Sequence, residues 1–533
     1  MHFMVRILIF LLIGIVMAQD KLNMPYDYSR HQGYVINNGS MMWNEDWKSG
    51  HFFFDGTFSN YPSNFGPQIE SNYFNPNREA TVSDSNYTAS YFEYIQGDYY
   101  LDNLDIGLEY STDHKITRLN GFKKRYAGAY NQYTISSGVP SPIQYTYLGN
   151  YSSKGDKNSI DIAIGNFNSY FGLLDSLGTA YLDSRITSSN ISYRHNFDSL
   201  YFTVDGHNFL QRYNSLYSEV IEEGVRYLTR TKLSGSIYLI RNHNHIFSVV
   251  ADFNKRSLRS DTFKSIGWSS VKIGVGHNNY SFNLGSMQLG NNNNIIMDGE
   301  ASYKLGRYLF KSSFAHIFRP SHISLSDTIY VEEKNHLILD GEWSHKRINI
   351  SAHIYLNNYQ GNKNSSNNEI ILPNNGSNIW FSGTIRYRLV GNHFFLLRYD
   401  KMKSNNYITD GIEDRVKIKF NNHFNLFSRA MGVQTSLSFS GFINRYSDYV
   451  LSPTEQYPIK IDSQEPLENI WLIDFSISCI VKKLQIKYEM NNLANIIYDY
   501  LGSNKQNHSV QFNPYFPKMR RLASLSIKWN FLD

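Results

Sequence analysis

Cysteine and charged residues are both scarce in this chain of 533 residues, and each shortage excludes a class of protein. A single cysteine, Cys479, can form neither an internal disulfide framework nor a cysteine-based zinc site. Charged residues make up 18% of the sequence, the net charge is only +5, and no basic block stands out. This balance gives no reason to expect a nucleic-acid partner.

Long apolar runs are missing as well, except at the start of the chain. After residue 20, no uninterrupted apolar run approaches the ~20 residues that a membrane-spanning helix needs. At the start, Arg6 precedes an apolar stretch at residues 7–17, and Val16-Met17-Ala18 forms a small-residue cleavage pattern. We interpret residues 1–18 as a secretory signal peptide that is cleaved after Ala18. The mature protein would then leave the cytoplasm without a transmembrane helix.

Aromatic residues are abundant, at 15% of the chain, and they are set in a period-two pattern. In residues 522–531 the odd-numbered side chains are apolar or aromatic, and the even-numbered ones are mostly polar. A similar alternation runs through residues 484–491, 471–482, 379–389 and 348–357. Successive side chains of a β-strand point to opposite faces, so each segment predicts a strand with one apolar face.

Two architectures can cover such apolar faces. A soluble sandwich or propeller encloses them in a core, whereas a membrane barrel turns them toward lipid. Segments of about ten residues match the thickness of the hydrocarbon core. Aromatic residues cluster near predicted strand ends, as at Tyr99-Tyr100 and at Trp529 with Phe531, and no per-blade repeat motif is present. We therefore predict an all-β fold, a transmembrane antiparallel β-barrel of about 20–22 strands.

The domain organisation follows from where the alternation begins. It starts near Gly50, and no boundary divides it afterwards. We assign residues 1–18 to the signal peptide, 19–49 to a short N-terminal segment, and 50–533 to the barrel with its extracellular loops.

Three stretches of the C-terminal half carry motifs that resemble one family. Phe318-Arg319-Pro320-Ser321 stands at the end of a predicted strand, and residues 490–498 read MNNLANIIY. Residues 517–521 read PKMRR and lead into the last alternating segment. In this order they resemble the barrel region of TonB-dependent outer-membrane receptors. The positions that carry the resemblance are Arg319, Pro320, Ser321, Asn492, Leu493, Tyr498, Arg520, Arg521 and Phe531.

The resemblance implies a 22-stranded barrel in the bacterial outer membrane that takes up solutes. It also implies that Phe531 replaces the terminal aromatic residue offered to the barrel-insertion machinery. Family members carry an N-terminal plug and a segment that an energy-transducing partner grips. Because the alternation starts near Gly50, it leaves no room for an ordinary plug, and residues 19–49 contain no such segment. We therefore expect a barrel without its own plug.

Basic residues gather on the polar faces of several predicted strands. They are Arg386 and Arg388 on one strand, Arg415, Lys417 and Lys419 on another, and Lys487 and Lys528 nearer the C-terminus. If the barrel closes, all of these point into its lumen, where Arg and Lys side chains favour anions. Acidic residues on the same faces, such as Asp474 and Glu489, leave the alternative that the charges pair with one another.

No catalytic or metal-binding spacing is evident. His243 and His245 could chelate a metal across a turn, but a solvated hairpin tip is the alternative. Cys479 falls on the apolar face of its strand and is interpreted as a small lipid-facing residue. We expect no catalytic residue, no cofactor and no metal.

Together these patterns predict an outer-membrane pore or solute-uptake channel rather than an enzyme. Its partners would be outer-membrane lipid and lipopolysaccharide, the barrel-insertion machinery and small solutes. Two other hypotheses stay open. One is a receptor whose plug or lid is a separate chain, such as a lipoprotein. The other is an outer-membrane hydrolase with a site at the barrel rim.

Overall fold

The computed structural model describes most of the chain from residue 86 onward. The described ranges are 36–37, 40–41, 86–125, 143–172, 181–216, 224–241, 244–277, 279–320, 331–360, 375–389, 393–405, 412–446, 449–451, 458–460, 467–494 and 521–532. Within these ranges no helix is both long enough and apolar enough to cross a membrane.

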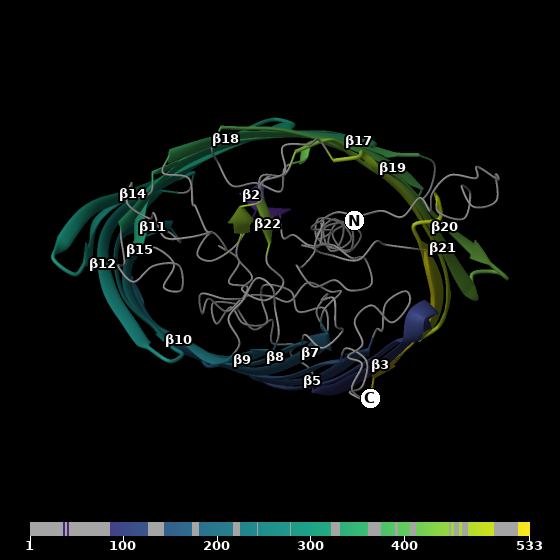
Figure 1. Ribbon diagram of the computed structural model, residues 1–533, viewed down its shortest axis with the longest axis horizontal. Coiled ribbons are helices and arrows are strands. Elements are labelled where there is room, and N and C mark those ends of the chain that lie inside the picture. The colour runs from purple at the N-terminus through teal and green to yellow at the C-terminus, as the bar shows by residue number, and fades with distance from the viewer. Residues whose placement is uncertain are drawn as a thin grey trace.

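Twenty-two strands form one closed ring, and each is hydrogen-bonded to its neighbours in antiparallel pairing (Figure 1). The first eleven are β3 (Tyr87–Gly97), β4 (Leu101–Thr112), β5 (Lys115–Arg125), β6 (Ile143–Lys154), β7 (Asn158–Gly172), β8 (Tyr181–Phe197), β9 (Leu200–Leu216), β10 (Gly224–Arg241), β11 (Asn244–Arg259), β12 (Phe263–His277) and β13 (Tyr280–Leu289). The second eleven are β14 (Asn292–Leu305), β15 (Tyr308–Pro320), β16 (Val331–His345), β17 (Ile348–Gln360), β18 (Asn375–Arg388), β19 (Phe394–Asn405), β20 (Ile412–Leu426), β21 (Met431–Arg445), β24 (Ile470–Val481), β25 (Leu484–Asn491) and β26 (Leu522–Leu532).

Four short strands lie outside the ring. β1 (Ile36–Asn37) pairs with β2 (Ser40–Met41), and β22 (Tyr449–Leu451) pairs with β23 (Pro458–Lys460). A 3-10 turn at Asp98–Tyr100 joins β3 to β4.

The ring closes between its last and first strands, where Trp529 of β26 lies opposite Phe92 of β3. This closure confirms the prediction of an all-β antiparallel barrel, and the strand number is the upper end of the predicted 20–22. The first strand of the ring begins at Tyr87. Residues 50–85, which the sequence analysis assigned to the barrel, lie outside the described residues.

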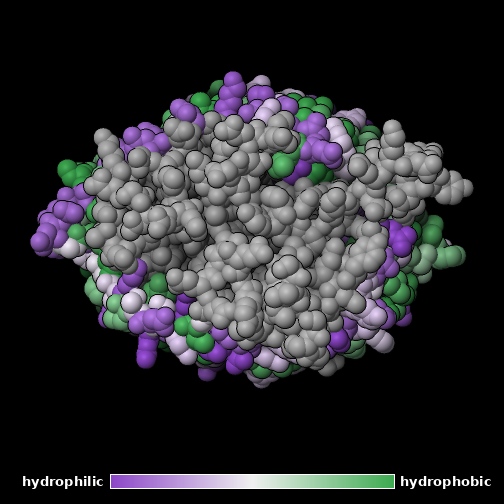
Figure 2. Space-filling model, in the orientation of Figure 1, coloured by the Kyte–Doolittle hydropathy of each residue, from purple (hydrophilic) through white to green (hydrophobic). Residues whose placement is uncertain are grey.

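The alternating pattern divides the barrel wall into two faces. Leu233 of β10, Phe253 of β11 and Ile273 of β12 are about half exposed on the outer face, at 53%, 50% and 53%. On the inner face Ser236 and Asn254 are buried. An apolar outer face and a polar interior are the arrangement of a membrane-spanning barrel. Viewed along the barrel, hydrophobic side chains reach its outer edge beside hydrophilic ones (Figure 2).

The two ends of the barrel differ in their connections. At one end the strands are joined by tight turns, as at residues 198–199, 306–307 and 346–347. At the other end the ring contains long connections, as at residues 361–374 and 492–521. Outer-membrane barrels have short periplasmic turns and longer extracellular loops. The short-turn end is therefore periplasmic and the long-loop end extracellular.

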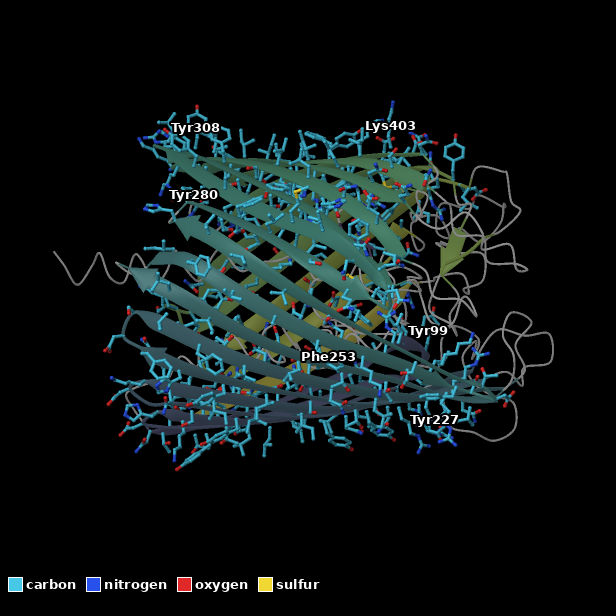
Figure 3. The ribbon with its side chains drawn as sticks, turned by 90° about the vertical axis from the view of Figure 1, so that its left-hand side faces the viewer. Tyr99, Tyr227, Phe253, Tyr280, Tyr308 and Lys403 are labelled. Atoms are coloured by element: carbon cyan, nitrogen blue, oxygen red, sulfur yellow. The ribbon has the colours of Figure 1, made fainter. Side chains whose placement is uncertain are left out.

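Aromatic side chains mark both ends of the outer surface, as the sequence predicted. Tyr280 and Tyr308 lie at the short-turn end, and Tyr99 and Tyr227 at the long-loop end (Figure 3). At the short-turn end Trp529 stacks on Phe531 at 5.2 Å between ring centroids. Such girdles hold a barrel at the level of the lipid headgroups.

Close strand packing makes one glycine of the wall a sensitive position. At Gly285 in β13, a Cβ atom would overlap the carbonyl oxygen of Val271 on β12, whereas Gly235 in β10 has open space at that position. We expect Gly285→Ala to lower the free energy of unfolding by about 1–3 kcal/mol, the usual cost of overpacking. Gly235→Ala is the matched control. The measurement is the temperature at which each barrel loses its compact electrophoretic form in detergent, and equal temperatures would contradict the prediction.

Candidate functional site

The lumen face carries polar and charged side chains that bond to one another across neighbouring strands. Lys272 of β12 pairs with Asp298 of β14, and Ser192 of β8 bonds to Asp205 of β9. Buried polar groups need such partners, because an unpaired one costs free energy. Such pairs are locally neutral.

One part of the lumen wall has a large excess of positive charge. Strands β18, β19 and β20 are adjacent, and their register places Thr384, Arg398 and Lys417 on one row. The next row toward the short turns holds Arg386, Leu396 and Lys419. We call this surface the cationic wall; its members are Arg386, Arg388, Arg398, Arg415, Lys417 and Lys419.

Contacts within the cationic wall position several of these side chains. Nε of Arg398 donates to Oδ1 of Asp400 at 3.0 Å. The Arg398 guanidinium lies 6.0 Å from the ring centroid of Trp380, and that of Arg386 lies 4.6 Å from Phe394. The same faces of β18–β20 carry two carboxylates, those of Asp400 and Glu413. Six cations against two anions leave an excess of four positive charges (6 − 2).

The two remaining basic residues predicted for this patch lie elsewhere on the ring, in ion pairs. Nζ of Lys487 on β25 lies 2.6 Å from a carboxylate oxygen of Glu489. Nζ of Lys528 on β26 lies 3.5 Å from Glu93 on β3. On β21, the strand next to β20, the residues opposite Lys417 and Lys419 are serines. The basic residues thus divide into one concentrated wall and separate charge pairs.

An aromatic and histidine patch adjoins the cationic wall on β16 to β19. Tyr355, Trp380 and Met402 are buried together there, at 7%, 5% and 1% exposure, with Ile338 against them. The ring of His353 meets Trp380 edge-on at 4.9 Å and bonds to Asp340. This patch offers flat apolar surface beside the guanidinium of Arg398.

Sequence reasoning missed Arg398 and Trp380, the two residues that join the wall to the patch. In residues 394–402 apolar side chains occupy both faces, so the period-two pattern is blurred. Trp380 sits on the polar face of its strand, where an apolar residue is not expected. The sequence did offer one clue to Arg398, because this residue lies between two predicted strands that each carry several basic residues.

A smaller polar recess opens near the short-turn end. It has a volume of about 190 Å³ and is lined by residues of β6 to β9 that include Asp161, Arg194 and Tyr201. Asp161 and Arg194 are buried, at 5% and 9% exposure.

Among the described residues, no three His, Cys, Asp or Glu side chains gather as a metal site would require. Cys479 of β24 pairs in register with Ile486, which is 42% exposed on the outer face. His243 and the side chain of His245 lie outside the described residues.

Comparison with known proteins identifies the fold. No protein-family model and no curated protein sequence matches the chain. Solved structures do match. The siderophore receptor PirA from Pseudomonas aeruginosa has a TM-score of 0.58 and 10% identity over 84% of this chain and 81% of its own. The FrpB iron transporter from Neisseria meningitidis has a TM-score of 0.64 and 7% identity over 84% of this chain and 83% of its own. The ferric yersiniabactin uptake receptor FyuA from Yersinia pestis has a TM-score of 0.61 and 8% identity over 85% of this chain and 81% of its own.

The chain has the barrel fold of the TonB-dependent outer-membrane receptors. At such low identities the match establishes the fold alone, which agrees with the resemblance seen in the sequence.

The receptor-like motif positions fall at the long-loop end of the barrel wherever the structure describes them, except Phe531. Arg319 and Pro320 end β15, and Asn492 and Leu493 follow β25. The backbone N–H of Asn492 donates to Asp474 at 3.0 Å, and that of Leu493 to the carbonyl of Ile473 at 2.7 Å. Nε of Arg521 lies 3.7 Å from Asp98. These contacts fasten the ends of the last strands. Ser321, Tyr498 and Arg520 lie outside the described residues.

Trp380 is a large and buried side chain, so its removal should lower the stability of the barrel strongly. Trp380→Ala would leave a cavity against Met402 and Tyr355, and we expect it to lower the free energy of unfolding by about 3–5 kcal/mol. Trp529→Ala is the control, because Trp529 is 48% exposed on the outer face. Urea unfolding of both variants in the same detergent measures the difference, and an equal or larger loss for Trp529→Ala would contradict the assignment.

Proposed function

We propose that this chain is an outer-membrane solute-uptake barrel whose cationic wall favours anionic solutes. One observation carries the proposal. Three adjacent strands present six basic and two acidic side chains to the same lumen face. The structures of matching fold are described as siderophore receptors and iron transporters, which supports uptake as the general activity.

The physical basis is the field inside a narrow passage with low-dielectric walls. Charge of one sign concentrated on such a wall raises the local concentration of solutes of opposite sign. Some other lumen cations have a carboxylate partner nearby, as Lys528 has Glu93 and Lys272 has Asp298, so the fields of these pairs largely cancel at a distance. A solute that passes β18–β20 meets the excess positive charge of the cationic wall.

The mechanism needs no covalent step. A solute enters from the long-loop end, meets the wall and the adjoining aromatic patch, and leaves at the short-turn end. The guanidinium group of an arginine such as Arg398 can bind a carboxylate or phosphate group through two parallel hydrogen bonds. The proposal includes the expectation from the sequence that the chain conducts without a plug of its own. It also includes secretion through a signal peptide ending near Ala18 and insertion guided by Phe531.

Ion selectivity in a planar bilayer tests the proposal. The mature wild-type barrel should give steady conductance steps, with a reversal potential in a potassium chloride gradient that shows preference for chloride. The variant Arg386→Gln/Arg398→Gln/Lys417→Gln should lose that preference, because it removes three of the six cations of the wall.

The matched control is Lys528→Gln, which removes a lumen cation that already has a carboxylate partner 3.5 Å away. It should change the reversal potential much less than loss of Arg386 alone, whose guanidinium lies beside the ring of Phe394. Cation preference in the wild type, or equal shifts for Lys528→Gln and Arg386→Gln, would contradict the selectivity. Absence of conductance from a folded barrel would contradict an open lumen.

A further inference from the structure

The outer surface carries a row of arginines that the uptake activity does not use. Arg185 of β8 lies opposite Arg212 of β9, which lies opposite Tyr227 of β10. Tyr227 in turn lies opposite Arg259 of β11. By the period-two rule these residues share the outer face with Ile191, Leu210 and Leu233, which are 48%, 42% and 53% exposed. We call Arg185, Arg212 and Arg259 the outer arginine row.

A carboxylate fixes two of the three arginines side by side. Asp183 accepts from Nε and Nη2 of Arg185 at 3.2 and 3.1 Å, and from Nη1 of Arg212 at 3.2 Å. The Asp183 side chain is 16% exposed, whereas the Arg185 side chain is 60% exposed. The two guanidinium groups are thus held in place, with further N–H donors left to face outward.

The outer face here carries an excess of positive charge. Arg259 and Lys255 are exposed on β11, and among the described residues neither has an ion-pair partner. Among the described residues, they make four cations with Arg185 and Arg212, against the carboxylates of Asp183 and the nearby turn residue Asp261. Two other cations on the outer face have a carboxylate nearby. Nζ of Lys123 lies 3.8 Å from Asp102, and Nζ of Lys401 lies 3.2 Å from Asp414.

The height of the row relative to the apolar band indicates what it meets in the membrane. Phe253 lies within that band, and Tyr227 lies toward the long loops (Figure 3). Tyr227 is six residues beyond Leu233 on β10, about 20 Å along the strand at ~3.4 Å per residue. With a strand tilt of roughly 40°, this is about 15 Å along the membrane normal. Lys255, two residues beyond Phe253, stands only about 5 Å above Phe253 by the same reckoning.

We propose that Lys255 and the outer arginine row form a binding site for the phosphorylated glycolipid of the outer leaflet. The cations are spread over about 10 Å of depth on the extracellular side, because four residues separate Lys255 from Arg259. A glycerophospholipid presents its phosphate at one depth. A glycolipid with a phosphorylated sugar headgroup presents anionic groups over a range of depths, while its acyl chains cover Ile191, Leu233 and Phe253.

Titration of the purified full-length barrel with diphosphoryl lipid A in detergent micelles tests the site. The binding readout is native mass spectrometry. We expect Arg185→Gln/Arg212→Gln/Arg259→Gln to bind at least about ten-fold more weakly than the wild type, since each basic residue near the lipid surface contributes to the attraction. The control variant Arg307→Gln/Arg347→Gln/Arg429→Gln removes equal charge from exposed short turns at the opposite end, and it should bind like the wild type.

Two further arms separate the lipid from other sources of phosphate. Lipid A without its phosphates should bind the wild type weakly, and inorganic phosphate at the same concentration should not displace the diphosphoryl form. Equal weakening of both triple variants would overturn the proposal, as would undiminished binding of dephosphorylated lipid A or displacement by inorganic phosphate. Both variants must keep the compact form in electrophoresis. Unchanged ion selectivity of the arginine variant would keep this result separate from that of the lumen.

Discussion

The closed ladder of backbone hydrogen bonds is the constraint on which the rest of this structure depends. In hydrocarbon no water can satisfy an exposed N–H or C=O group, so a sheet can cross a bilayer only if it has no free edge. Pairing of β26 with β3 removes that edge. Once the ring is closed, each strand must turn alternate side chains to lipid and to the lumen, and the apolar and polar residues sort accordingly.

The ladder also makes neighbours of residues that are far apart in sequence. Arg398 stands between Thr384 and Lys417 because three strands pair in that register. On the outer face, the same kind of register brings Arg185 beside Arg212 and Tyr227 beside Arg259. A shift of one residue in any of these pairs would turn the side chains of that strand to the opposite face. Both charged surfaces are therefore consequences of the register that holds the barrel together.

Local pairing decides which charges can act at a distance. Lys487 and Lys528 lie within ion-pair distance of Glu489 and Glu93, and such pairs present little net field. The cationic wall and the outer arginine row instead contain more basic than acidic side chains. In the roles we propose, the first meets a passing anion in the lumen, whereas the second holds an anion of the headgroup region. Identical residue types would then serve different partners because the barrel wall separates two environments.

The sequence by itself determined the fold class, the two faces of most strands and the approximate strand number. These depend on period-two alternation, which is a local property of each segment and is strong in residues such as 522–531. It also placed Arg386, Arg388, Arg415, Lys417 and Lys419 on polar faces. Only the tertiary structure decided that the ring begins at Tyr87, that Arg398 completes the wall and that Asp183 clamps two arginines. Those features depend on which strands pair and in what register, and cross-strand hydrogen bonding sets this between segments that the local pattern cannot relate to each other.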